Sequence, residues 1–285
     1  MEMNFFVKSH GLGNEYIVLD QSALNFELTK LQIIKMCNIH VGIGSDGILL
    51  KVPSAKADFG LRIINPDGSE AEKSGNGLRI FAKYLFDYRF TKKLNFTIDT
   101  LGGLVTAHIL EQKNGRAFMI RIDMGKANFT SREIPVSFAK DECFNEPLEI
   151  EGKNYPIHCV SMGNPHCVVL RDTLDETEIR NIGPQIENHP MFPNRINVQF
   201  VKVISREVVD ALIWERGAGF TQASGSSSSA IAAVLVKKGL TDRNISVRMP
   251  GGILKIDVDE SWNICLTGEV REIASGIING EFYND

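Results

Sequence analysis

The sequence predicts an α/β (α+β) protein made of two similar halves, each with short strands around one apolar helix. Three observations support this fold class: an internal repeat about 150 residues apart, two helix-like segments too apolar for a surface, and short alternating segments bounded by Gly or Pro. The composition agrees, since 43% of the 285 residues are hydrophobic and 23% are charged. This length allows one large domain or two of roughly 140 residues.

The first half is organised around residues 65–85. A turn-rich loop with several glycines leads to apolar residues at helical spacing, which are Leu78, Phe81, Ala82 and Leu85. Ser74 lies at the junction of loop and helix. A helix start offers unpaired N–H groups and the positive end of a dipole, which suit an anion. The alternative is that Ser74 is only an N-cap.

A second copy of this element runs from Glu215 to Leu235. Subtracting 150 places Ser224-Gly225 on Ser74-Gly75, and the two copies predict buried helices over Leu78–Phe86 and Ser228–Val236. Further matches follow in the same order: Asn14 with Asn164, Gly47 with Asn197, and Gly102-Gly103 with Gly251-Gly252. We therefore expect a duplicated architecture with its seam near Lys126–Pro135, in which the two junctions face each other across a cleft.

The segment between the first two matches predicts a short helix over Thr29–Cys37, with Thr29 as its cap, and a strand over Ile48–Val52. Between them, Gly42-Ile-Gly-Ser-Asp-Gly47 has the letters of a dinucleotide-binding fingerprint. That fingerprint needs a strand before it and a helix after it, and here the order is reversed. A nucleotide site is not expected.

Charge and cysteine usage narrow the function classes. The net charge is −4 and no Lys/Arg cluster occurs, which argues against nucleic acid as a partner. No apolar run approaches the roughly 20 residues of a membrane span, and the first residues lack a signal-peptide core. Five irregularly spaced cysteines indicate reduced thiols in a cytoplasmic protein, and the histidines show no metal-ligand spacing. We expect no metal site.

Ordered blocks along nearly the whole chain resemble the diaminopimelate epimerase family. They are Gly11-Leu-Gly-Asn14-Glu-Tyr, Gly42-Ile-Gly-Ser-Asp-Gly47, Asn65-Pro-Asp-Gly-Ser-Glu-Ala-Glu, Gly75-Asn-Gly, Gly163-Asn-Pro-His166, Asn197-Val, Glu215-Arg-Gly-Ala-Gly and Thr267-Gly268. The resemblance implies two pseudo-symmetric domains, each a barrel-like mixed sheet around a central helix. It places the N-terminal half at 1–126 plus 269–285, because the C-terminal strand returns, and the C-terminal half at 127–268.

The resemblance also implies a cofactor-independent epimerase that interconverts LL- and meso-diaminopimelate. One base removes the α-proton on one face and one acid delivers a proton on the other, and in the family both groups are cysteines at helix starts. This sequence has Ser74 and Ser224 there. A hydroxyl is a much poorer base than a thiol near neutral pH. Cys167, beside His166, is the nearest other thiol but reads as a core residue of a strand.

The remaining family residues carry over. His166 and Glu215 would flank the reacting end of the substrate, and Asn14 would line the pocket. The distal amino-acid end would be bound by Asn65, Asn164, Asn197 and Arg216, and backbone donors would come from Gly75, Asn76, Gly225 and Ser226. Against this, single Asn residues are usually turn residues, and Glu215-Arg216 could be a surface ion pair. Gly47 occupies a position that varies in the family, so it is weak evidence for the site.

Two hypotheses of different class follow. The first is an isomerase acting on diaminopimelate or another amino acid, and the second is a catalytically silent amino-acid-binding protein on the same scaffold. A weaker third is a relative with a carboxylate base, Glu70 or Glu72, which have no counterpart in the second copy. Two origins fit the paired serines: an engineered replacement of both bases, or a natural paralogue. Homodimerisation is suggested by the family resemblance alone.

Overall fold

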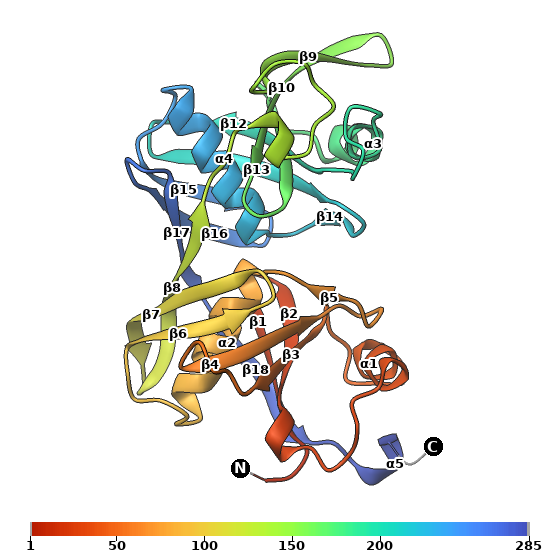
Figure 1. Cartoon of the computed structure of the whole chain (residues 1–285), viewed down its shortest axis with the longest axis vertical. Helices are drawn as coiled ribbons and strands as arrows, with labels where there is room; N and C mark the ends of the chain where they lie inside the picture. Colours follow the sequence, from red (N-terminus) through yellow and green to blue (C-terminus); the bar gives the residue numbers. More distant parts are fainter. Residues whose placement is uncertain (1, 284–285) are drawn as a thin grey trace. The chain divides into compact units, whose positions relative to one another are not determined.

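The computed structural model describes residues 2–283, and the chain divides into two compact units (Figure 1). One unit runs up to Ile122 and resumes at Gly268, and the other is Asp123–Thr267. Both divisions fall inside long strands, whereas the sequence placed them at 126/127 and 268/269. None of the helices in residues 2–283 combines the length and apolar character that crossing a bilayer requires.

The first unit is a mixed sheet with one helix inside it. Its strands are β1 (Phe5–Gly11), β2 (Asn14–Asp20), β3 (Ile48–Val52), β4 (Phe59–Ile64), β5 (Glu70–Ala71), β6 (Asn95–Thr100), β7 (Gly103–Lys113), β8 (Arg116–Lys126) and β18 (Arg271–Ile277), and its helices are α1 (Lys30–Cys37), α2 (Gly75–Asp87) and α5 (Gly280–Tyr283). The pairing order is β18-β1-β2-β3-β4-β6-β7-β8, and β5 adds to β4. The pairs β2–β3 and β4–β6 are parallel, and the others are antiparallel.

The second unit repeats this plan. Its strands are β9 (Phe144–Ile150), β10 (Lys153–Ser161), β11 (Pro165–Leu170), β12 (Asn197–Val203), β13 (Val208–Glu215), β14 (Gly219–Thr221), β15 (Asn244–Met249), β16 (Gly252–Val258) and β17 (Asn263–Glu269), and its helices are α3 (Glu176–Glu187) and α4 (Gly225–Lys237). The order is β9-β10-β11-β12-β13-β15-β16-β17, with β14 added to β13. Its two parallel pairs, β11–β12 and β13–β15, are the counterparts of those in the first unit. The predicted duplication is confirmed.

The helices α2 and α4 are the centres of the two units. Both begin directly after the predicted serines, and their bounds differ by 150 residues at each end. Every residue of α2 from Gly75 to Phe86 is buried, and α4 buries its core from Ser227 to Leu235. Because a helix that is apolar around most of its surface needs cover on all sides, each sheet wraps around its helix (Figure 1). The expected sheet around a buried helix is confirmed.

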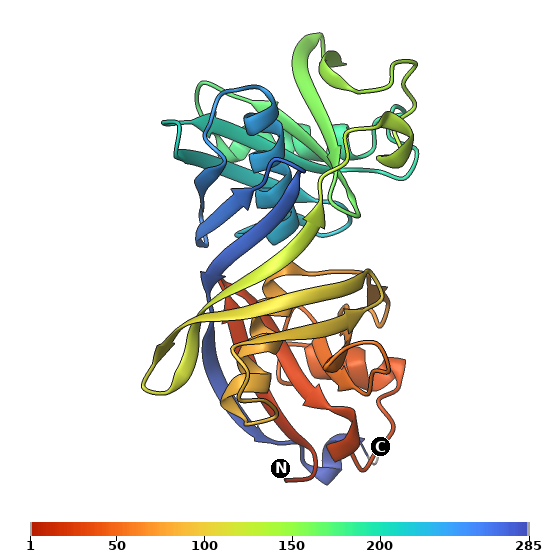
Figure 2. The ribbon, with the colours of Figure 1, turned by 60° about the vertical axis from the view of Figure 1, so that its left-hand side comes forward.

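The C-terminal segment returns to the first unit, as predicted. β18 pairs antiparallel with β1, from Phe5 opposite Ile277 to His10 opposite Arg271. Figure 2 shows this blue strand running alongside the red N-terminal strand. The following helix α5 reaches α1, where Lys35 Nζ donates to Phe282 O at 3.0 Å.

Two shorter helices lie outside the sheets. α1 has the predicted bounds and a capping box between Thr29 and Gln32. Its counterpart α3 was not predicted, although Asp175 caps it and Ile179, Ile182 and Ile186 recur at helical spacing. The segment 42–47 lies between α1 and β3, which is the wrong context for a dinucleotide-binding loop.

Candidate functional site

The two predicted serines are the N-caps of α2 and α4. Ser74 Oγ accepts a hydrogen bond from the Gly77 N–H at 3.1 Å, and Ser224 Oγ accepts one from the Ser227 N–H at 3.4 Å. Both serines have extended backbone conformations, as N-caps do. Ser74 is therefore an N-cap, as the alternative predicted, and its role in a site stays a prediction. A cap is also compatible with a site, because the hydroxyl lies at the positive end of a helix dipole.

The first junction contains a phenol that the sequence analysis did not single out. The Tyr16 hydroxyl lies 3.3 Å from Ser74 Oγ. Tyr16 comes from β2, and adding 150 to its number gives His166, so the repeat itself carried the signal. The chain approaches closely behind the ring: a Cβ on Gly47 would lie 2.6 Å from Ile64 O and 2.9 Å from a Tyr16 ring carbon. Gly47 thus has a packing role here.

A chain of side-chain hydrogen bonds starts in the first turn of α2. Asn76 Nδ2 donates to Asn14 Oδ1 at 3.1 Å, and Asn14 Nδ2 donates to Asp46 Oδ2 at 2.8 Å. At the other end, Arg79 Nη2 donates to Asn76 Oδ1 at 2.7 Å. The structure therefore brings the predicted Asn14 and Asn76 together, and it adds Asp46 and Arg79 to them.

Asn65 is engaged in a local turn. Its side-chain nitrogen donates to Ser69 Oγ at 2.9 Å, and its backbone N–H donates to Ser69 O at 2.8 Å. Such contacts are typical of a loop Asn. Its role in ligand binding stays a prediction.

His166 is the centre of the second junction and is fully buried on β11. Gln199 Nε2 lies 3.1 Å from His166 Nδ1 and can only donate, so Nδ1 is the acceptor. The other ring nitrogen, Nε2, then carries the proton and faces Asn164 Oδ1 at 2.9 Å. Burial, with a smaller contribution from the Arg216 charge, lowers the pKa of His166 to about 3. The imidazole is therefore neutral near pH 7, with both nitrogens engaged.

Gln199 links this imidazole to α4. Its Nε2 also donates to Ser227 Oγ at 3.1 Å, while its Oε1 is buried without a partner among residues 2–283. Gln199 was not among the residues predicted from the sequence. Its position between the apolar residues Val198 and Phe200 of β12 was a signal that could have found it.

Asn197 holds the turn that begins at Arg216, directly after Glu215 at the end of β13. Its Nδ2 donates to Pro165 O at 2.8 Å, and its Oδ1 accepts from the Arg216 N–H at 3.0 Å. The Arg216 guanidinium donates to Asn194 O at 3.2 Å. Asn197 thus ties β11, β12 and the turn after β13 together.

Comparison with known proteins decides the family. The family model described as diaminopimelate epimerase matches residues 6–130 and 158–273. Diaminopimelate epimerase 2 of Nostoc sp. is 46% identical over 279 residues, which cover 98% of this chain and 96% of that protein. Diaminopimelate epimerase of Pelotomaculum thermopropionicum is 40% identical over 273 residues, covering 95% and 97%. This chain belongs to the diaminopimelate epimerase family.

Solved structures agree on the fold of this family member. A hydroxyproline epimerase from Agrobacterium vitis superposes with a TM-score of 0.71 at 14% identity, covering 95% of this chain and 91% of that one. A PhzF-family protein from Bacillus anthracis gives a TM-score of 0.68 at 17% identity, covering 98% and 100%. The fold predicted from the family resemblance is confirmed.

Within residues 2–283, no cysteine caps α2 or α4 or lies in the first turn of either helix. Cys167 is fully buried in β11, which confirms its reading as a core residue. Cys143 and Cys159 are buried beside each other, and their mutual hydrogen bond and burial raise the pKa of Cys143. Within residues 2–283 no group of three or more His, Cys, Asp or Glu side chains is placed to hold a metal ion.

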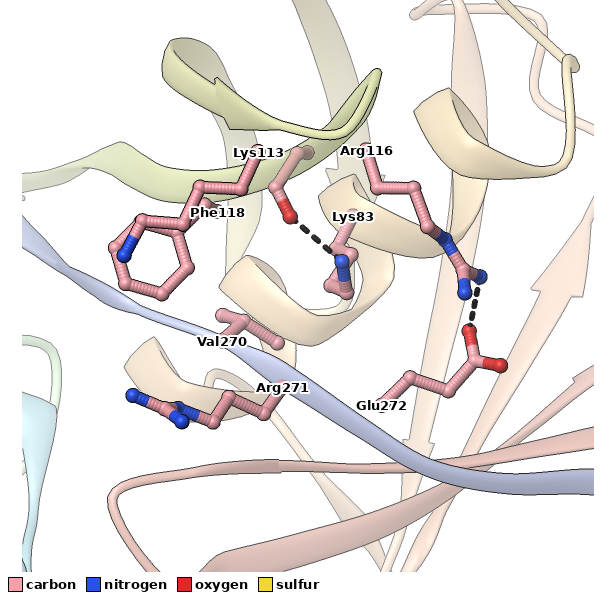
Figure 3. Close-up of a pocket in the computed structure, with 8 residues that line it drawn as sticks. Lys83, Lys113, Arg116, Phe118, Val270, Arg271 and Glu272 are labelled. Atoms are coloured by element: carbon pink, nitrogen blue, oxygen red, sulfur yellow. Dashed lines mark hydrogen bonds and ion pairs between the residues drawn. The ribbon is translucent and has the colours of Figure 1, made fainter.

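A pocket of about 280 Å³ lies elsewhere in the first unit, lined by Lys83, Lys113, Arg116, Ala117, Phe118, Val270, Arg271 and Glu272 (Figure 3). Its cations are already engaged. Lys83 Nζ contacts Ala117 O at 2.6 Å and Asp87 at 2.7 Å, Arg116 pairs with Glu272, and Lys113 Nζ lies 3.3 Å from the centre of the Phe118 ring. The pocket contains none of the residues that the family resemblance assigns to the site.

Proposed function

We propose that this chain binds diaminopimelate and inverts its α-carbon without a cofactor, with Ser74 and Ser224 in the two acid–base positions. The observation that carries the proposal is the pair of N-cap serines at equivalent positions of two duplicated helices, in a chain of this family. Inversion needs one group to take a proton from one face and another to return a proton to the opposite face. A duplicated helix start supplies two such positions.

The helix starts would also bind the α-carboxylate. The first N–H groups of a helix have no partner within it, and at α4 these include Gly225 and Ser226. Gly75 and Asn76 occupy the same positions in α2. Donors aimed at the carboxylate would stabilise the charge that develops on it as the α-proton leaves.

Recognition of the rest of the substrate would follow the family pattern. His166 and Glu215 would flank the reacting end, and Asn14 would line the same region. The distal amino-acid end would contact Asn65, Asn164, Asn197 and Arg216. Because burial lowers the pKa of His166 to about 3, this imidazole is a weak base, which supports a hydrogen-bonding role.

A second candidate function is binding of the amino acid without turnover. It is favoured by the surroundings of the two hydroxyls: each accepts from a backbone N–H, and His166 has both ring nitrogens engaged. A serine that acts as a base normally needs an adjacent general base. Proton transfer through the two serines is therefore expected to be slow.

Proton NMR of LL-diaminopimelate with this protein in D2O tests both candidates. Loss of the α-proton signal with formation of the meso isomer would support epimerisation. A retained signal with line broadening would support binding alone. If neither exchange nor broadening is observed, diaminopimelate is not the ligand.

A further inference from the structure

Arg79 lies inside the first unit and is fully buried. It sits one turn into α2, three residues after Asn76. Its Nη2 donates to Asn76 Oδ1 at 2.7 Å, whereas its Nε and Nη1 have no hydrogen-bond partner among the described residues. A side chain with five donors thus satisfies only part of its capacity inside the protein.

Stability alone does not account for this residue. Removing a guanidinium from water costs several kcal/mol, and an apolar side chain of similar volume usually stabilises a core better. Burial lowers the pKa of Arg79 to about 9, so the group is still charged near pH 7. The carboxylate in its hydrogen-bond chain, Asp46, is reached only through two amides, those of Asn76 and Asn14.

The hydrogen bonds of this chain have a fixed direction. A guanidinium can only donate, so it holds the carbonyl oxygen of Asn76 toward itself and turns Nδ2 toward Asn14. Asn14 Oδ1 then accepts, and its own Nδ2 faces Asp46. Arg79 therefore sets the orientation of the side-chain amides of Asn76 and Asn14, two residues that the proposed function places beside the substrate.

The neighbouring strand makes room for the charge. A Cβ on Gly11 of β1 would lie only 2.9 Å from Arg79 Nη2. The corresponding position of the second unit, 150 residues later, is Ser229, whose hydroxyl donates to Gly225 O at 2.9 Å within its own helix. The buried cation is thus a feature of the first junction and has no counterpart in α4.

We propose that Arg79 is a positioning residue that makes the start of α2 selective for a carboxylate, the α-carboxylate of the amino acid. This inference rests on the proposed function and concerns the contribution of α2, the one of its two helix starts that has a buried cation nearby. The buried positive charge adds to the positive end of the helix dipole, and a bound carboxylate compensates both. The same charge orients Asn76 and Asn14 for contact with that ligand.

Two substitutions separate this role from a structural one. Arg79→Met removes the charge and keeps most of the volume, and Arg79→Lys keeps the charge. Ser229→Ala is the matched control, because it alters the equivalent turn of α4 without changing charge. For each variant, the dissociation constant of meso-diaminopimelate is measured by calorimetry, and the unfolding temperature is measured without ligand.

We expect Arg79→Met to bind at least about tenfold more weakly, since hydrogen bonds to charged groups are worth about one to two decades in affinity. Its unfolding temperature should be equal or higher, because an incompletely paired buried cation is gone. Arg79→Lys should recover most of the affinity, and Ser229→Ala should match the wild type. A structural role predicts the opposite for stability.

Equal binding by Arg79→Met and the wild type would overturn the inference alone. Weak binding by both Arg79 variants, together with lower unfolding temperatures, would also overturn it and would indicate a packing role. A wild-type protein that does not bind meso-diaminopimelate would overturn the proposed function, and this inference with it.

Discussion

The two helix junctions share a backbone design and differ in the side chains around it. Each has a serine N-cap, a glycine at the first helical position and a sheet strand on either side. The facing positions differ: Tyr16, Leu49 and Gly77 in the first unit correspond to His166, Gln199 and Ser227 in the second. In the first set the Tyr16 hydroxyl lies within hydrogen-bond distance of Ser74 and the other two residues have no polar side-chain atoms, whereas in the second set hydrogen bonds join all three side chains.

These differences are matched within each junction. A Cβ on Gly77 would lie 3.0 Å from Leu49 Cδ2, so the first unit has an apolar strand residue against a helix residue without a side chain. In the second unit the Ser227 hydroxyl accepts from the Gln199 amide, which also donates to His166. Leu49 therefore fits a glycine at the facing helix position, and Gln199 fits a serine there. The duplicated backbone accommodates either combination, provided that the strand residue and the helix residue change together.

The largest expected effect comes from restoring thiols at both junctions. The variant Ser74→Cys with Ser224→Cys should invert LL-diaminopimelate at least about 100-fold faster than the wild type, because positioned acid–base groups contribute 10²–10⁴ in rate. Each single variant should exchange the α-proton of one stereoisomer without inverting it, since one junction then lacks its partner. NMR in D2O measures both quantities. A single variant as fast as the double would show that one junction performs both proton transfers.

The second effect is acid sensitivity of the second unit. Burial lowers the pKa of His166 to about 3 and that of His158 to about 4, so the unfolded chain binds protons first as the pH falls below about 6.5. The free energy of unfolding is at its full value above that pH. Below it, each imidazole should remove about 1.4 kcal/mol per pH unit until the pH reaches its folded-state pKa.

Urea unfolding at pH 7, 6 and 5 measures this slope. His166→Asn should reduce the slope to that of His158 alone. Tyr16→Phe, at the matching position of the first unit, should leave it unchanged because phenol groups do not change charge in this range. An unchanged slope in His166→Asn would contradict the assignment of a buried neutral imidazole.

A third test breaks the matched pair in the second unit. Gln199→Leu removes the donor to His166 and Ser227 and should cost about 1–3 kcal/mol of the free energy of unfolding, because buried acceptors lose their partner. The double variant Gln199→Leu with Ser227→Gly copies the first unit. It should lose less free energy of unfolding than the two single variants lose in sum. Denaturant unfolding of all four proteins gives the coupling energy. Additive costs would show that the two positions are independent.

The smallest effect concerns the caps themselves. Ser74→Ala should cost about 1 kcal/mol, within the usual range for loss of an N-cap. Ser224→Ala should cost about 0.5 kcal/mol, because its acceptor distance is 3.4 Å compared with 3.1 Å at Ser74. Thermal unfolding compares the two, with Ser74→Asn as a control that keeps a capping oxygen. A larger loss at Ser224 would contradict this ranking.

Local sequence patterns and the internal repeat predicted much of the fold. The sequence by itself determined the duplication, the short helix predicted over Thr29–Cys37 with Thr29 as its cap, the strand over Ile48–Val52 and the two buried helices that follow Ser74 and Ser224. These features depend on residues within one or two turns of each other, or on the same pattern occurring twice. The prediction that the C-terminal strand returns to the first unit depended on the family resemblance.

The surroundings of the junctions were decided by tertiary structure. Tyr16 reaches Ser74 across 58 residues of sequence, and Gln199 joins His166, 33 residues away, to α4. Arg79 was not among the residues predicted from the sequence, and only its burial without full pairing sets it apart. Sequence spacing specifies which face of an element a residue occupies. Which side chains meet there, and how much water remains around them, depends on the register of strands that are distant in the chain.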